Sequence, residues 1–361
     1  MTSRIFDALV DICGPDYARV ARSIDTAGGR RAGHVAVPAT AQAVGDILRF
    51  ATDEGLAVVP RGSGSKINWG APRERADLIL DTARLSGLWS HDVGAGTVEV
   101  AGGTPVRALQ AALALRGQRL PVDPPSRTAT VGGMLAVNES GPLRHRFHAP
   151  AEHVERVGYV DSTGQPGRRP GLAEIAGVIT SAVIRLQPLP AARHWVTAPV
   201  PSPLQAAKLA AEATGHEVSA IEADLPAEGP GAVSALFEDA GADRLAEAWG
   251  VPVTPTAPRW WGQYPFGRDD VALRLSVAPE DLAATVYALA DAIGGAVPVR
   301  GSAGLGSVLA VLPGTLPAER LEQIMETLRH VLMARNGRAA LITAPPELAS
   351  RLDMATRREL F

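Results

Sequence analysis

The chain has 361 residues, of which 46% are hydrophobic and 20% charged, and its formal net charge is -3. This composition is that of an ordinary globular protein, and the length suits two domains. The charge balance gives no reason to expect nucleic acid as a partner. Cys13 is the single cysteine, which excludes an intrachain disulfide and any cysteine-ligated cluster or zinc site.

Two further classes of site are not expected. His145 and His148 form the one tight histidine pair, but they lie among arginines without neighbouring carboxylates, so we predict no metal site. The N-terminus lacks the apolar core of a signal peptide, and no uncharged apolar run reaches the roughly 18 residues needed to span a membrane. A cytoplasmic protein without a transmembrane segment is expected.

The first predicted elements are a helix and a strand that lead into a glycine-rich loop. Thr40 can cap a helix whose apolar positions recur at helical spacing up to Gly55. A strand is predicted at residues 56–59, and the loop up to Lys66 follows it. Gly62 and Gly64 can adopt positive φ, so successive backbone N–H groups can form a nest for an anion such as phosphate.

Alternating strands and helices continue after this loop. The pattern predicts strands at residues 78–80 and 97–101 and a helix that starts at Thr104 and Pro105 and ends at Gly117. A second loop, residues 123–142, begins with two prolines that stiffen it and continues with threonines and glycines. A ligand can lie close to such a backbone. A proline–glycine loop in front of a short core helix is the alternative interpretation of this segment.

Taken together, the two loops resemble the FAD-binding domain of the vanillyl-alcohol oxidase (PCMH-type) superfamily, and in particular the FAD-binding subunit of bacterial glycolate oxidase. The resemblance continues through residues 177–190 and reaches residues 260–266 and 300–306. It implies non-covalent FAD, because neither loop contains His or Cys. The cofactor-binding residues that it implies are Pro60, Arg61, Gly62, Ser63, Gly64, Ser65, Lys66, Pro124, Pro125, Thr130, Val131, Gly132, Gly133, Asn138, Ser140, Gly141, Val178 and Ile179.

A proline-rich stretch, Pro188–Pro203, marks the expected boundary between a flavin domain (residues 1–190) and a second domain (residues 191–361). From residue 271 on, the pattern predicts the order βαββαβ, with strands at 271–277, 296–299, 307–312 and 339–343 and helices at 280–293 and 318–334. This order is typical of ferredoxin-like folds. The predicted fold class is therefore α+β, a PCMH-type FAD-binding domain followed by a ferredoxin-like cap that shapes a substrate pocket.

The chain departs from the glycolate oxidase subunits in two places. Their Gly-Tyr-Asp motif and the glycine-rich stretch beside the flavin have no match, and residues 172–176 stand where that stretch would be. The closing Asn-Pro-Gly segment has no match either. The half of the site that holds the pyrophosphate is expected to be preserved, whereas the half around the flavin ring is expected to be reduced.

The resemblance implies oxidation of a small 2-hydroxy acid, with a homologous flavoprotein and an iron–sulfur protein as partner subunits. A base would most often be a histidine or a carboxylate. The predicted catalytic residues are His145, His148 and Arg146. An arginine fork for the substrate carboxylate has the candidates Arg144, Arg146, Arg259 and Arg274.

Two other functions stay open at this stage. The chain could be a non-catalytic, flavin-free or flavin-bound structural subunit of such a complex, or it could bind another nucleotide with the same loops. Trp260 and Trp261 are expected at a domain interface or in a pocket wall.

Overall fold

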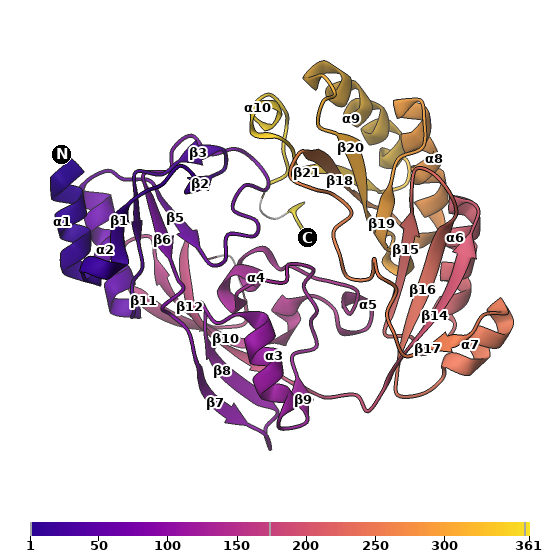
Figure 1. Cartoon of the computed structure of the whole chain (residues 1–361), viewed down its shortest axis with the longest axis horizontal. Coiled ribbons are helices and arrows are strands. Elements are labelled where there is room, and N and C mark those ends of the chain that lie inside the picture. The colour runs from indigo at the N-terminus through magenta and orange to yellow at the C-terminus, as the bar shows by residue number, and fades with distance from the viewer. Residues whose placement is uncertain (1, 173–174, 357–358) are drawn as a thin grey trace.

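The computed structural model describes residues 2–172, 175–356 and 359–361. Two smaller sheets with their helices form the N-terminal half, and one large sheet forms the C-terminal half beside it (Figure 1). The end of the chain returns to the space between the two halves, where helices α4 (Val131–Val137) and α5 (Arg144–Phe147) also lie.

The first sheet has the strand order β1-β4-β6-β5, and β5 runs parallel to β6. Helix α2 begins where the sequence predicts it, because the Thr40 hydroxyl accepts a hydrogen bond from the Ala43 amide. Its apolar face packs on the sheet through residues such as Ile47 and Leu48. The elements are α1 (Thr2–Cys13), β1 (Ala18–Val20), β2 (Thr26–Ala27), β3 (Arg30–Arg31), β4 (His34–Ala36), α2 (Ala41–Asp53), β5 (Val58–Arg61) and β6 (Leu78–Asp81).

The second sheet has the order β11-β10-β12-β8-β7, and its neighbouring strands pair antiparallel. The predicted helix after Thr104 is present but shorter, ending at Ala114. The Thr104 hydroxyl accepts from the Gly87 amide and so does not cap this helix. The elements are β7 (Leu88–Asp92), β8 (Thr97–Ala101), α3 (Val106–Ala114), β9 (Gln118–Arg119), β10 (Val154–Asp161), β11 (Pro166–Pro170), β12 (Gly177–Arg185) and β13 (Gln187–Pro188).

The C-terminal sheet has eight strands in the order β17-β14-β16-β15-β19-β20-β18-β21. It consists of two βαββαβ units joined edge to edge by the pairing of β15 with β19. The second unit, β18 to β21, is the ferredoxin-like arrangement that the sequence predicts. The first unit, β14 to β17, was not predicted from the sequence. The elements are β14 (Arg193–Val200), α6 (Pro203–Thr214), β15 (Ala220–Leu225), β16 (Gly231–Glu238), α7 (Ala242–Trp249), β17 (Val253–Thr254), β18 (Asp270–Ser276), α8 (Leu282–Ile293), β19 (Val299–Ser302), β20 (Ser307–Pro313), α9 (Ala318–Met333), β21 (Arg338–Thr343) and α10 (Pro346–Ala349).

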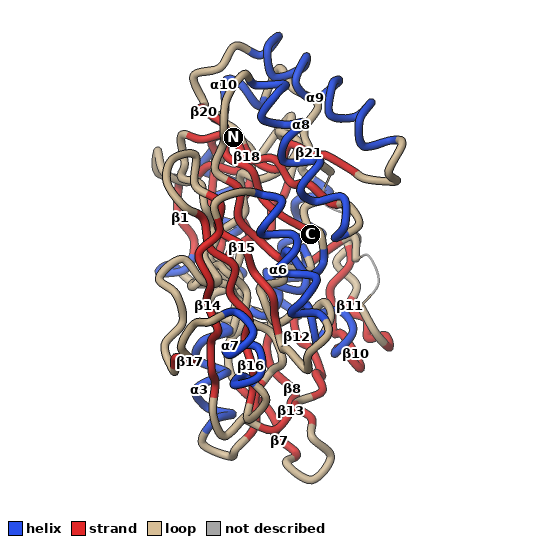
Figure 2. Tube along the Cα trace, turned by 90° about the vertical axis from the view of Figure 1, so that its right-hand side faces the viewer, coloured by secondary structure: helices blue, strands red, loops and turns tan. Residues whose placement is uncertain are grey.

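Helices α6, α8 and α9 cover one face of this sheet, the face turned away from the N-terminal half (Figures 1 and 2). Successive residues of a strand point to opposite faces, so Ile221 and Ala223 enter the core beneath the helices while Glu222 points the other way. The inner face therefore presents polar side chains such as Arg274 and Arg300 toward the N-terminal half.

Buried contacts join the two halves. Arg119 donates from both terminal guanidinium nitrogens to the Glu238 carboxylate, and Arg193 binds the same carboxylate. Trp261 packs with Leu143 from the N-terminal half and with Trp195 from the sheet, whose ring centroid is 6.1 Å away. Trp261 thus belongs to the interface. We propose that the domain boundary lies at residues 190 and 191, between β13 and β14.

Within residues 2–172, 175–356 and 359–361, no helix has the length and apolarity required to cross a membrane.

Candidate functional site

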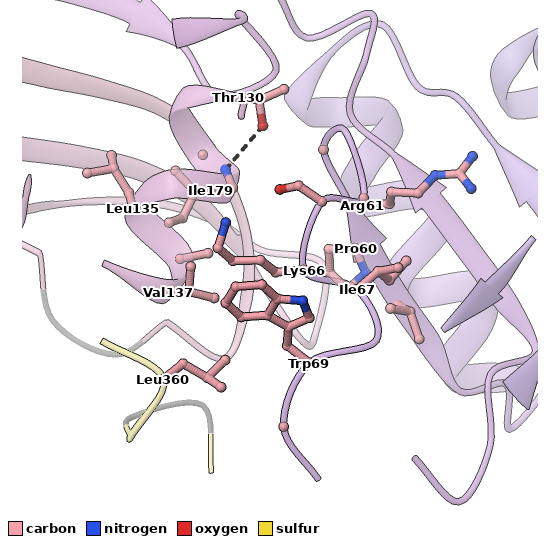
Figure 3. A pocket seen from close by; sticks show the side chains of 18 of the residues that line it. Pro60, Arg61, Lys66, Ile67, Trp69, Thr130, Leu135, Val137, Ile179 and Leu360 are labelled. Carbon is pink, nitrogen blue, oxygen red and sulfur yellow. Dashed lines mark hydrogen bonds between the residues drawn. The ribbon is translucent and has the colours of Figure 1, made fainter. Parts of the chain in front are cut away.

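A cavity of about 960 Å³ lies between the glycine-rich loop after β5 and helix α4. This volume is at the upper end of the range for small-molecule sites and suits a ligand as long as a dinucleotide. Figure 3 shows Lys66, Trp69 and Val137 around it, with Leu360 from the end of the chain on one side. The cavity therefore reaches from the first sheet to the junction of the two halves.

Glycine brings the two loops into contact at this cavity. A Cβ atom on Gly62 would lie 2.2 Å from Thr130 Oγ1, so no other residue fits there without separating the loops. Gly64 has a φ of +77°, which favours glycine. In the described part of the chain, the amides of residues 62–65 donate no hydrogen bond to the protein. Free amides on a tight loop are suitable donors for phosphate oxygens, so this cradle fits a pyrophosphate.

The Arg61 guanidinium is not directed at this cradle. It donates to Asp81 at 2.8 Å and to Asp25 at 3.0 Å, and in Figure 3 it points away from Lys66. Hydrogen bonding by Arg19, opposed by burial and assisted by the Arg22 amide and Arg61, lowers the pKa of Asp25. The Arg61 side chain thus holds the base of the loop through these two carboxylates.

The Lys66 side chain also has partners within the protein. Its Nζ lies 2.5 Å from Glu139 Oε1 and 4.9 Å from the centroid of the Trp69 ring, and it also contacts Ser126. Burial lowers the pKa of Lys66, and the carboxylate of Glu139 opposes that shift. Tyr264 donates to the same Glu139 oxygen at 2.8 Å. Lys66 therefore forms part of the wall between the loops and the C-terminal half.

The other predicted cofactor residues divide into groups. Those that line the large cavity, besides Pro60–Lys66, are Thr130, Gly132, Gly133, Asn138, Val178 and Ile179. Val131 is fully buried in the core behind them. Pro125, Ser140 and Gly141 instead line a second cavity, and Pro124 lines neither. Within the altered segment, Leu172 and Ile175 line the large cavity, whereas residues 173–174 lie outside the described residues.

The second cavity, of about 90 Å³, lies between the loop at residues 140–144 and the inner face of the large sheet. It shares Trp69, Leu360 and Phe361 with the large cavity, and the rings of Trp69 and Phe361 stack with centroids 6.0 Å apart. Three side chains therefore separate the two cavities. The small volume suits a molecule of a few heavy atoms.

Arginines dominate the charge of this second cavity. Arg144, Arg274 and Arg300 line it, and Arg300 is paired with Asp224 at 2.8 Å. No carboxylate of the described residues forms an ion pair with Arg144 or Arg274. Burial, together with the charge of Arg144, lowers the pKa of Arg274 to about 10. Two facing cations without an acidic partner favour an anion between them.

The cavity also contains one carboxyl side chain, Glu222, which is 7% exposed. Burial and the charge of Asp123 raise the pKa of Glu222 to about 8. Burial likewise raises the pKa of Asp123, to about 7. Glu222 and Tyr264 were not among the predicted site residues. The structure adds both of them to the candidate site.

The three predicted catalytic residues line neither cavity. His145 packs against Gly304, Arg146 donates to Ser219 at 3.3 Å, and His148 ends helix α5 with a φ of +62°. The neighbouring Arg144, from the same loop, does line the second cavity. Of the other arginine candidates, Arg274 lines the cavity and Arg259 does not.

Comparison with known proteins agrees with this fold. Residues 32–166 match the FAD binding domain family. The whole chain resembles the structure of an alkyldihydroxyacetonephosphate synthase, with a TM-score of 0.68 and 15% identity over 93% of this chain and 81% of that one. The predicted fold class, α+β with a PCMH-type FAD-binding domain, is therefore confirmed.

Three curated relatives match part of this chain. D-2-hydroxyglutarate dehydrogenase of Xanthomonas citri is 28% identical over 36% of this chain and 28% of the relative. D-lactate dehydrogenase of Archaeoglobus fulgidus is 33% identical over 30% and 24%. Glycolate oxidase subunit GlcE of Escherichia coli is 33% identical over 28% and 29%. The matches thus span less than a third of each relative. The match of residues 32–166 to the FAD binding domain family supports FAD as the cofactor of this protein.

Proposed function

We propose that this protein is an FAD-linked oxidoreductase that oxidises a small 2-hydroxy acid. The observation that carries the proposal is the position of the arginine-lined cavity, which shares Trp69, Leu360 and Phe361 with the cavity that suits FAD. The relatives named for D-lactate, D-2-hydroxyglutarate and glycolate support the same substrate class.

The chain's own residues would divide the task. The free amides of residues 62–65 and the open backbone at Gly132 and Gly133 would hold the pyrophosphate. When bound, FAD would supply the redox chemistry as the hydride acceptor. Arg144 and Arg274 would bind the substrate carboxylate and fix its orientation. The three shared apolar side chains would exclude water from the junction.

The volume of the second cavity favours the smaller members of this class. A site of about 90 Å³ suits glycolate or lactate better than a dicarboxylate such as 2-hydroxyglutarate. We extend the proposal to partner subunits, a homologous flavoprotein and an iron–sulfur protein, because this chain has one cysteine and cannot itself ligate an iron–sulfur cluster. The similarity to glycolate oxidase subunit GlcE supports an assembly of this type.

Anaerobic titration of the FAD-loaded protein tests the proposal. Glycolate or D-lactate should bleach the flavin band once about one equivalent per flavin has been added. D-2-hydroxyglutarate should bleach it much more slowly. Arg274→Gln should suppress bleaching while the protein retains FAD. An FAD-loaded protein that no 2-hydroxy acid bleaches would contradict the enzyme proposal and favour a structural subunit.

A further inference from the structure

The carboxyl group of Glu222 is the feature of the arginine-lined cavity that the proposed function leaves without a role. Glu222 is held in place by strand β15, whose neighbouring residues Ile221 and Ala223 are buried beneath the helices. Its side chain therefore points to the inner face of the sheet and into the cavity. Burial makes this carboxyl group costly to ionise, and the charges around it raise or lower that cost further.

The charged groups around Glu222 come from several elements. Burial is the largest cause of the raised pKa of Glu222, and the charge of Asp123, from the N-terminal half, raises it further. The Ser302 side chain and Arg300 on β19 lower the same pKa. Arg300 forms an ion pair with Asp224. The remaining titratable groups at the cavity are Arg144, Arg274 and Tyr264, and His145 packs against the nearby Gly304. Burial lowers the pKa of His145 and so favours its neutral form.

We propose that Glu222 couples anion binding to proton uptake, so that the cavity accepts a small carboxylate only when the Glu222 carboxyl is neutral. The inference rests on the proposed function, since it concerns the same anion site. An ionised Glu222 would compete with the ligand for Arg144 and Arg274 and would repel its charge. A neutral Glu222 leaves both arginines to the ligand.

Linkage makes the coupling measurable. Because the ligand favours the protonated form, its binding draws a proton onto Glu222 wherever that group is ionised in the free protein. With a pKa of about 8, Glu222 is mostly protonated at pH 7 and mostly ionised at pH 9. The affinity should therefore fall about tenfold between pH 7 and pH 9.

Isothermal titration calorimetry with oxalate tests this on the FAD-loaded full chain. Oxalate is close to glycolate in size and has no C–H bond to lose, so no turnover interferes. Measurements at pH 7 and pH 9, each in two buffers of different ionisation enthalpy, give the protons taken up. We expect close to one proton per oxalate at pH 9 for the unaltered protein. Glu222→Gln should bind with similar affinity at both pH values and take up none.

Asp123→Asn is the matched control, since Asp123 is the other carboxyl group with a raised pKa at this junction. In that variant Glu222 loses an opposing charge, so the fall in affinity should shift to lower pH while proton uptake persists. Proton uptake that survives Glu222→Gln and disappears in Asp123→Asn would overturn the assignment.

Two results separate this inference from the proposed function. Oxalate binding of equal affinity at both pH values would overturn the role of Glu222 and leave the anion site intact. A complete lack of oxalate binding by a folded, FAD-loaded protein would overturn both.

Discussion

Lys66 and Glu139 form a buried ion pair, with Nζ and Oε1 2.5 Å apart and side chains only 6% and 1% exposed. Lys66 comes from the first glycine-rich loop and Glu139 from the end of the second. Tyr264, from the C-terminal half, donates to the same carboxylate. One carboxylate therefore ties both cofactor loops to the other half of the molecule.

Lys66→Met should destabilise the protein strongly, because it leaves Glu139 buried without its cation. Removing one partner of a buried ion pair typically costs about 3–5 kcal/mol. Urea denaturation of the FAD-free protein measures this directly. The double variant Lys66→Met with Glu139→Gln should recover part of the loss. A single variant as stable as the unaltered protein would show that the pair does not join the loops.

Gly62→Ala should weaken FAD binding about tenfold or more, because the new Cβ would lie 2.2 Å from Thr130 Oγ1 and force the loops apart. Fluorescence titration with FAD gives the affinity. Gly295→Ala is the matched control, since a Cβ there meets nothing within 4 Å. Equal affinities of the two variants for FAD would contradict the proposed cradle.

Arg274→Gln should raise the KM for a 2-hydroxy acid by about 10- to 100-fold, since one charge-assisted contact is worth about 1.5–3 kcal/mol. Arg259→Gln serves as the control, because Arg259 is exposed and lines neither cavity. Steady-state assays with an artificial electron acceptor compare the two. A larger effect of the Arg259 substitution on KM would contradict the binding of the substrate carboxylate by Arg274.

The free energy of unfolding should fall between about pH 5 and pH 8, and the raised pKa of Glu222 should account for part of this fall. Its pKa is raised to about 8 in the folded state, so the unfolded chain releases this proton at lower pH than the folded chain does. The stabilisation is complete at low pH and is lost as the pH rises toward 8. Glu222→Gln should flatten this decline, as thermal unfolding at several pH values would show. An identical pH dependence in both proteins would contradict the raised pKa.

Most of the predicted cofactor residues line one cavity, and the sequence could group them because they are neighbours in the chain. The glycines of the first loop and the Thr130–Gly133 segment carry their geometry locally, and both line the large cavity. The pairing of Arg61 with Asp25 joins segments that lie far apart in the sequence, so the residue types alone could not predict it.

The second cavity could not be predicted in the same way. Glu222, Tyr264 and Arg274 come from separate segments that only the sheet topology brings together. The first βαββαβ unit was missed because Pro199 and its neighbouring prolines indicate a linker. Strand β14 accommodates Pro199 because β17 pairs with it only at Trp195 and Val196. The missing N–H therefore breaks no pairing on that side.

We propose that this chain holds FAD between its two glycine-rich loops and passes substrate electrons to it. The most direct test is the visible absorption spectrum of the purified protein after incubation with FAD and desalting, recorded before and after anaerobic addition of glycolate. The account predicts retained flavin bands that bleach with glycolate in the unaltered protein and are lost on desalting in Gly62→Ala. A colourless unaltered protein that cannot be reconstituted would contradict it.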